Sequence, residues 1–140
     1  MVRRLGRNDD TTITGNEFEY LGGSAIVLWG RTSGALDAKG ERQLPWSDHP
    51  NGPDSMGLDC PRDTVIAHNV AHDLGLWQKQ SSFVFQAVSA RSVVKDNVAY
   101  NLPRAAINLN DGHCGGDVIS GNLLANTCKE SGDHGPINSW

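Results

Sequence analysis

The chain has 140 residues, of which 38% are hydrophobic and 20% charged, and its formal net charge is −4. A chain of this length can bury a core of its own as a single domain, residues 1–140, and nothing in it requires a second domain. The acidic balance and the scattered basic residues argue against a nucleic-acid-binding face. Its 16 glycines and frequent asparagines favour short strands joined by tight turns over long helices.

The N-terminal segment carries Arg3, Arg4 and Arg7 but no apolar run, so neither a signal peptide nor a membrane span is predicted. We interpret this basic cluster as a solvated chain end. The three cysteines, Cys60, Cys114 and Cys128, lack C-x-x-C spacing, which predicts neither a zinc knuckle nor a complete disulfide framework. One disulfide between two of these cysteines remains an alternative.

A short pattern then recurs four times along the chain, as TITGNEFEY (12–20), VIAHNVAHD (65–73), VVKDNVAYN (93–101) and VISGNLLAN (118–126). In each copy a β-branched residue precedes a shared asparagine by three positions, and an apolar position follows it by two. The shared asparagines are Asn16, Asn69, Asn97 and Asn122. A second, alternating strand follows each copy, as AIVLWG (25–30), FVFQA (83–87), AINLND (106–111) and PINSW (136–140).

Period-2 alternation assigns the residues of these second strands to two faces. One face is predicted to carry Ile26, Phe83, Ile107 and Ile137, followed by Leu28, Phe85, Leu109 and Ser139. The outward face is predicted to carry Val27, Val84, Asn108 and Asn138, followed by Trp29, Gln86, Asn110 and Trp140.

Repeats of this kind predict an all-β solenoid, a parallel β-helix of about four rungs, in which each strand pairs with its copy about 4.8 Å away. The four asparagines are predicted to stack at a bend, where Asn bonds backbone groups and tolerates left-handed conformations. A two-sheet β-sandwich is the alternative for short, regularly spaced strands. The open ends of so short a coil indicate a fragment of a longer chain, whose neighbouring rungs would be its partners.

Residues 31–63 form one long loop insertion between rungs, rich in Gly, Pro and Asp. Shorter excursions at 77–82 and 128–135 precede second strands, and all three are expected near one edge of one face. Asp54, Asp59 and Asp63 of the long loop offer oxygen ligands for calcium, but their spacing matches no known calcium loop, so no cofactor and no metal site is predicted.

The Asn-centred repeats, with GLWQKQSSFVFQAVSAR, NLPRAAINLNDG and KESGDHGPINSW, resemble proteins with the right-handed parallel β-helix domain, the pectate-lyase-like superfamily. The resemblance covers residues 12–140 and implies a right-handed coil. The family includes glycoside hydrolases, polysaccharide lyases and epimerases, together with non-enzymatic surface proteins, so it implies the fold more strongly than a reaction. It also implies an extracellular or cell-surface location for the full-length protein.

The predicted outward face suits a saccharide, because sugars bind to aromatic platforms and to amide and carboxylate groups. We therefore expect a polysaccharide or oligosaccharide to contact Trp29, Gln86, Asn108, Asn110, Asn138 and Trp140. Asp111 and Asp133 lie after and before second strands of neighbouring rungs, and two carboxylates about 5 to 9.5 Å apart can hydrolyse a glycosidic bond. Ordinary turn chemistry also accounts for both aspartates.

His134 is a candidate general base, and Lys79 or Arg104 could neutralise a uronate carboxylate. Hydrolysis by Asp111 and Asp133 is the first hypothesis for function. A non-catalytic polysaccharide-binding or structural surface module is the second, and lyase or epimerase chemistry on a uronate polymer is the third. His68 and His72 are assigned structural roles, since they share no helical face for a metal.

Overall fold

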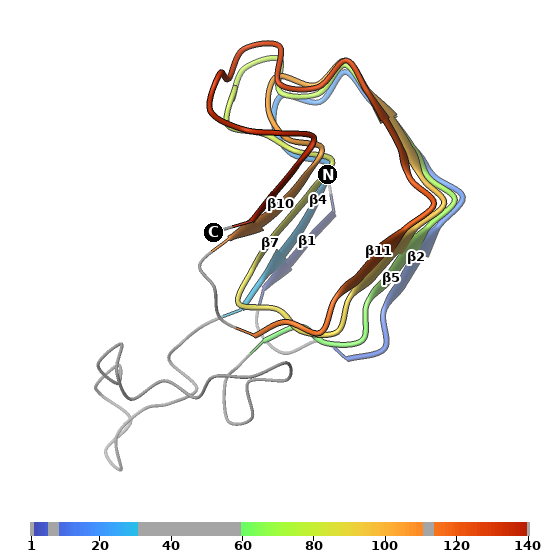
Figure 1. Cartoon of the computed structure of the whole chain (residues 1–140). Coiled ribbons are helices and arrows are strands. Elements are labelled where there is room, and N and C mark those ends of the chain that lie inside the picture. Colours follow the sequence, from blue (N-terminus) through green and yellow to red (C-terminus); the bar gives the residue numbers. More distant parts are fainter. Residues whose placement is uncertain (1, 6–8, 31–59, 111–113, 140) are drawn as a thin grey trace, which may run out of the picture.

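The computed structural model describes residues 2–5, 9–30, 60–110 and 114–139, and its regular structure there consists of strands alone. The strands form three sheets, with every pairing parallel (Figure 1). The prediction of an all-β structure with parallel strands is therefore confirmed. A β-sandwich, which is built from antiparallel sheets, is excluded for the described residues.

Sheet A contains β1 (Val2–Leu5), β4 (Ile26–Trp29), β7 (Val84–Ala87), β10 (Ile107–Asn110) and β13 (Ile137–Ser139). Sheet B contains β2 (Thr12–Thr14), β5 (Val65–Ala67), β8 (Val93–Lys95) and β11 (Val118–Ser120). Sheet C contains β3 (Glu17–Glu19), β6 (Val70–His72), β9 (Val98–Tyr100) and β12 (Leu123–Ala125). After β1 the chain visits sheets B, C and A in turn, and each such passage is called a repeat below, numbered 1 to 4.

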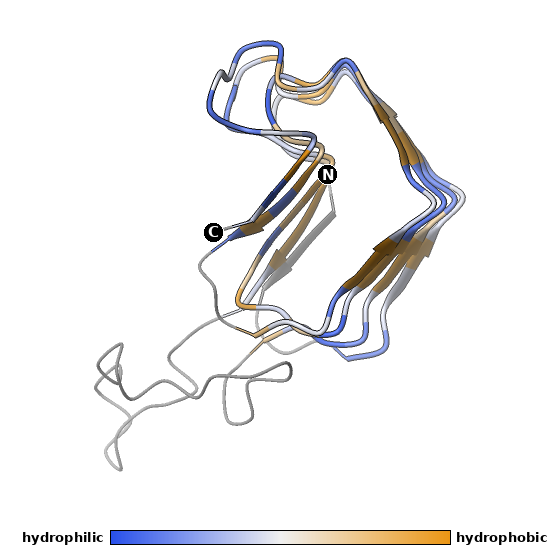
Figure 2. Ribbon diagram, in the orientation of Figure 1, coloured by the Kyte–Doolittle hydropathy of each residue, from blue (hydrophilic) through white to orange (hydrophobic). Residues whose placement is uncertain are grey.

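The core lies between the three sheets, where one apolar residue from the middle of each short strand points inward. Like residues stack on like, because a parallel in-register pairing places equivalent positions in columns. The inward columns are Ile13, Ile66, Val94 and Ile119 in sheet B and Phe18, Ala71, Ala99 and Leu124 in sheet C. Figure 2 shows the apolar strands and the more polar corners between sheets B and C.

The register of sheet A corrects one predicted strand. Val84, and not Phe83, pairs with Ile26 and with Ile107. Phe83 occupies the bend before β7, where its carbonyl accepts a hydrogen bond from the Ile26 amide, and it is also buried. Two successive residues face inward at this bend, so the alternation begins one residue later than period 2 alone predicts. Phe85 therefore points outward and Gln86 inward.

Each corner between sheets has a residue with positive φ, which lets the chain change direction within one or two residues. At the corner between sheets B and C this residue precedes the repeated asparagine, and the column is Gly15 (67°), His68 (55°), Asp96 (53°) and Gly121 (65°). The left-handed conformation thus belongs to the neighbour of the asparagine and not to the asparagine itself. Gly121 also faces Asp96 so closely that a Cβ there would lie 2.2 Å from Asp96 Oδ1.

The four asparagines form a continuous hydrogen-bonded ladder along the B–C corner. Asn69 Oδ1 accepts from both the backbone N and Nδ2 of Asn16, at 3.0 Å each. Asn97 Oδ1 accepts from the same two groups of Asn69 at 2.9 and 3.0 Å, and Asn122 Oδ1 accepts from those of Asn97 at 3.0 and 2.9 Å. The side chains therefore satisfy polar groups that the bend removes from the strand pairings.

The described residues that flank the long insertion lie at a different corner from the shorter excursions. Gly30, its described neighbour on one side, follows β4 at the corner leading to sheet B, whereas residues 77–82 and 128–135 lead from sheet C into β7 and β13. The expectation that all three emerge at one edge is therefore wrong. Residues 31–59 themselves lie outside the described part of the chain.

Candidate functional site

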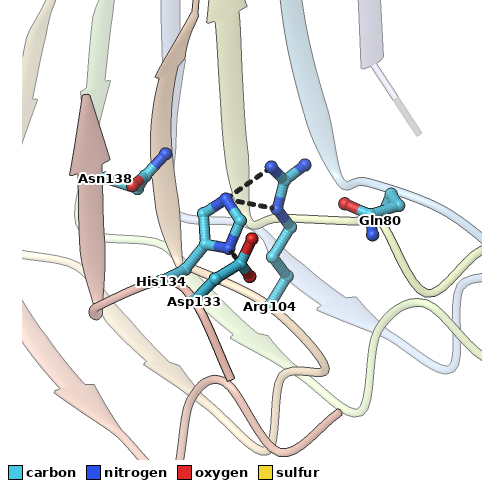
Figure 3. Close-up of a pocket in the computed structure, with 5 residues that line it drawn as sticks. All are labelled: Gln80, Arg104, Asp133, His134 and Asn138. Atoms are coloured by element: carbon cyan, nitrogen blue, oxygen red, sulfur yellow. Dashed lines mark hydrogen bonds and ion pairs between the residues drawn. The ribbon is translucent and has the colours of Figure 1, made fainter. Parts of the chain in front are cut away.

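A cavity of about 330 Å³ is lined by residues of the connections between sheets C and A and by one residue of β13 in sheet A. Its lining is polar and consists of Gln80, Arg104, Asp133, His134 and Asn138 (Figure 3). Gln80, Arg104 and His134 come from equivalent connections in repeats 2, 3 and 4, and Asn138 comes from β13. The stacking of repeats brings together side chains that are up to 58 residues apart in sequence.

Backbone hydrogen bonds between the connections hold these side chains in place. The amide of Cys128 donates to the Arg104 carbonyl at 3.1 Å, and the amide of Glu130 donates to the Pro103 carbonyl at 2.9 Å. The connection of repeat 4 is thereby fixed to that of repeat 3. This attachment places His134 beside the Arg104 guanidinium.

Arg104, His134 and Asp133 form a hydrogen-bonded chain (Figure 3). Arg104 Nε and Nη2 lie 3.2 and 2.6 Å from His134 Nε2, and both can only donate, so Nε2 accepts. His134 is therefore neutral in this arrangement, with its proton on Nδ1, which donates to Asp133 Oδ1. Ser131 Oγ also donates to Asp133 Oδ1, at 2.8 Å. These two bonds, that of Ser131 first, hold the pKa of Asp133 below its usual value.

Among the residues that the structure describes, the charge of Arg104 has no direct counter-ion. Arg104 is 9% exposed, and within the described residues its side chain bonds only to the neutral His134. Nη1 therefore retains both of its protons for another acceptor. Buried charges are normally paired, so an arginine placed in this way is suited to an anion that enters the cavity.

Asn138 contributes an amide that other asparagines orient. Its Nδ2 donates to Asn108 Oδ1 at 2.9 Å, and Asn108 Nδ2 donates to Asn110 Oδ1 at 2.7 Å. Asn108 is fully buried, so it positions Asn138 and does not offer its own amide to a ligand. Asn138 thus keeps its carbonyl oxygen directed away from Asn108, as an acceptor at the cavity wall.

Trp29 and Lys79, which were also predicted to bind a sugar, are not among the residues that line this cavity. Trp29 is 43% exposed and packs against Phe85 with ring centroids 5.6 Å apart, but β4 lies three strands from β13, or about 14 Å. Lys79 Nζ pairs with Glu130 Oε1 at 3.0 Å on the surface. Trp140 lies outside the described residues.

The prediction that Gln86 contacts a sugar on the outer face is wrong, because its side chain points into the core and is 3% exposed. Its Nε2 donates to Asp117 Oδ2 at 2.8 Å, while its buried Oε1 has no hydrogen-bond partner in the part of the chain that the structure describes. The one-residue shift of register at the bend before β7 is the reason that it cannot contact a ligand on the outer face.

Of the predicted pair of carboxylates, Asp111 and Asp133, the structure describes only Asp133. Asp111 lies outside the described residues, so its distance from Asp133 stays a prediction. It directly follows Asn110, the last residue of β10, whereas Asp133 precedes β13. Since Ile107 pairs with Ile137 in parallel, Asn110 lies about 10 Å along the strand from the end that the Asp133 connection enters.

Two residues of the connection between β6 and β7 were not predicted as binding residues. Gln80 lines the cavity, and Trp77, three residues earlier in the same connection, is 88% exposed. Trp77 lies over Gly22, where a Cβ would approach its ring to 2.5 Å. Both residues lie in a connection that is equivalent to the one that contains His134, and this equivalence could have been recognised in the sequence. Their neighbours, however, are set by the stacking of the connections in space.

Of the aspartates considered for calcium, Asp54 and Asp59 lie outside the described residues. Asp63 accepts from Arg91 Nε and Nη2 at 2.8 and 2.6 Å, and this bond is the main reason that its pKa lies below the usual value. The carboxylate is thus already engaged by a cation, which does not favour a second one.

No helix suited to crossing a membrane occurs in the part of the chain that the structure describes. Comparison with known proteins assigns no family: no family model matches the chain, and no curated protein or solved structure matches it either.

Proposed function

We propose that this protein binds an acidic saccharide, with the Arg104 guanidinium engaging a uronate carboxylate in the cavity beside sheet A. The supporting observation is that Arg104 is 9% exposed and has no carboxylate partner among the described residues. Gln80 and Asn138 add amide groups that can bond sugar hydroxyls. The exposed Trp77 offers an aromatic face to a neighbouring sugar residue.

We also propose that the fold is a right-handed parallel β-helix of about four rungs, of the pectate-lyase-like type. The three parallel sheets support it, as does the repeated order of sheets B, C and A. A polysaccharide partner would in turn place the full-length protein at the cell surface or outside the cell.

The test is the affinity for an oligosaccharide of uronic acid residues compared with a neutral one of equal length, measured by isothermal titration calorimetry. Arg104→Gln removes a charge-assisted contact worth about 1.5–3 kcal/mol, so binding of the acidic ligand should weaken roughly 10- to 100-fold. Arg104→Lys keeps the charge but loses the planar fork, and it should weaken binding less.

Arg91→Gln is the matched control, because this arginine carries the same charge but bonds Asp63 at a distant corner. Its affinity for the acidic ligand should stay within about twofold of that of the unmodified protein, since a distant surface charge adds little. Equal affinity for the neutral and acidic ligands, or an Arg104→Gln variant that binds as well as the unmodified protein, would contradict the proposal.

A lyase or epimerase reaction is the second candidate, favoured by the placement of His134 beside Arg104. His134 Nε2 accepts from Arg104 in the present arrangement. A substrate carboxylate that draws the guanidinium toward itself would release this nitrogen to take a proton as a general base. Incubation with the uronate oligomer would then give an unsaturated product that absorbs in the ultraviolet or an epimerised sugar, whereas hydrolysis by Asp111 and Asp133 would give new reducing ends and no unsaturation.

A further inference from the structure

A separate cluster of polar side chains lies on the outer face of sheet C, in repeats 1 and 2. Glu17 and Glu19 point outward from β3, since Phe18 between them faces the core, and His72 points outward from β6. Glu19 is the register partner of His72, and Glu17 is the partner of Val70. Three side chains of two adjacent strands therefore share one patch.

The ligand atoms of these side chains converge. His72 Nε2 lies 3.5 Å from Glu17 Oε1 and 3.8 Å from Glu19 Oε2, and the three groups each place one such atom within 4.8 Å of the others. Both distances exceed those of an ordinary N–H···O hydrogen bond. His72 is 8% exposed as a residue, whereas both glutamates are mainly exposed.

The orientation of the His72 ring is set by its other neighbours. Nδ1 lies 2.8 Å from Asp73 Oδ2, an acceptor, so Nδ1 carries a proton. The ring also stacks on Tyr100, with centroids 4.9 Å apart and an interplanar angle of 8°, and meets Tyr20 edge-on at 6.0 Å. Nε2 is thereby aimed at the two carboxylates, and in the neutral ring it has a lone pair directed at two anions.

A positive charge between the two carboxylates and the ring nitrogen would be stabilised by all three groups. From this geometry we infer that Glu17, Glu19 and His72 bind a divalent transition-metal ion of the zinc type, which ties β3 to β6. Tetrahedral zinc bonds of about 2.0–2.1 Å place its ligand atoms about 3.3 Å apart, close to the two separations from Nε2. An acidic residue that orients the ligating imidazole through its other nitrogen, as Asp73 does, is a common feature of such sites.

A proton on His72 Nε2 competes with a metal ion for the same position. Without a metal, the hydrogen bond to Asp73 is the main cause that raises the pKa of His72 above its usual value, and Glu17 contributes in the same direction. A metal must displace any proton from Nε2, so the two occupants exclude each other. The test therefore has to report on Nε2 directly.

The experiment is a calorimetric titration of the chelator-treated full chain with Zn²⁺, combined with long-range ¹H–¹⁵N NMR of the histidine rings. We expect a binding site whose occupation shifts the His72 Nε2 resonance to that of a metal-bound nitrogen. Affinity at this site should fall more than tenfold in the double variant Glu17→Gln/Glu19→Gln, because both charged ligands are lost. The two side chains are largely exposed, so this variant should keep its fold, which its thermal unfolding checks.

Glu130→Gln is the control, since it removes one exposed carboxylate from a distant connection, and its zinc affinity should stay within about twofold. Co²⁺ as a probe separates this site from the cysteines, because thiolate ligands give intense charge-transfer absorption that oxygen and imidazole ligands lack. The inference would be overturned by zinc affinity that the double variant leaves unchanged, by a thiolate spectrum, or by a His72 Nε2 that stays protonated with Zn²⁺ present. None of these readouts involves a saccharide.

Discussion

At the scale of single residues, the half-buried carboxylate of Asp117 lies beside the buried Gln86, and its negative charge is costly. Asp117 accepts from the Ser92 amide and from Gln86 Nε2, at 2.8 Å each. Burial nevertheless dominates and raises the pKa of its carboxyl above the usual value. The ionised form is thus less stable here than in the unfolded chain, which makes this carboxyl a destabilising group at neutral pH.

We expect Asp117→Asn to leave stability unchanged or to increase it at pH 7. The folded-state pKa is raised, so the favourable contribution of Asp117 is complete below its unfolded pKa and is lost as pH rises through the folded one. Urea unfolding of both proteins between pH 3 and 7 measures the difference, which should shrink toward low pH.

Asp63→Asn is the control, because the contribution of Asp63 to stability should depend on pH in the opposite direction. The pKa of Asp63 is lowered, chiefly by Arg91, so its contribution exists above the unfolded pKa and disappears as pH falls through the folded one. The pair is well exposed, so the loss at pH 7 should be about 1 kcal/mol or less. An Asp117→Asn variant that loses stability at pH 7 as Asp63→Asn does would contradict the assignment of a desolvated carboxyl.

At the scale of structural elements, the asparagine ladder stabilises the corner between sheets B and C. Asn97, 1% exposed, donates from Nδ2 to the Ile66 carbonyl at 3.0 Å and links Asn69 to Asn122. Asn16 occupies the exposed end of the ladder, where its side-chain amide donates to Asn69 Oδ1 and to the Thr14 carbonyl. The same residue type therefore has different partners within the ladder.

Asn97→Ala should lower the free energy of unfolding by about 2–4 kcal/mol, because it removes the acceptor of the buried Asn69 amide and breaks the ladder on both sides. Asn16→Ala should cost about 1 kcal/mol or less, because water can replace its exposed bonds. Chemical denaturation of the two variants gives both values. An equal loss of unfolding free energy in both variants would contradict a special role for the buried middle of the ladder.

At the scale of the whole molecule, burial decreases toward repeat 4. Ile107 is fully buried, whereas Ile137, the next member of the same inward column, is 46% exposed because no described strand covers β13. Ile119 and Leu124 are likewise only partly buried in their columns. Unpaired strand edges with exposed apolar residues favour pairing with another chain.

We therefore expect this 140-residue chain to associate through the edge formed by β11, β12 and β13. Ile137→Lys should weaken this association roughly tenfold or more, since it removes apolar burial worth about 1.5–3 kcal/mol and places a charge at the contact. Sedimentation velocity over a range of protein concentrations measures the effect. Val93→Lys, an outward change in the middle of sheet B, is the control, and a monomeric unmodified protein at all concentrations would refute the expectation.

Much of the architecture was readable from the sequence, because a parallel stacked fold repeats its local chemistry. The shared asparagine and the β-branched residue three positions earlier identified strands of sheets B and C, since each repeat places the same side chain in the same column. Arg104, Asp133, His134 and Asn138 were also named from their chemistry, and all four line the cavity. Their residue types were sufficient to nominate them.

The tertiary structure decided which residues meet. Period 2 placed Gln86 outward, but the buried bend at Phe83 shifts the strand by one residue, a packing effect that no pattern within a single strand reveals. The approach of His72 to Glu17 and Glu19 spans more than 50 residues of sequence and depends on the register of β3 against β6. The sequence by itself thus determined the repeating strands and their corners, which arise from local and periodic interactions. Only the three-dimensional stacking decided the cavity and the cluster on sheet C, because both depend on lateral neighbours from different repeats.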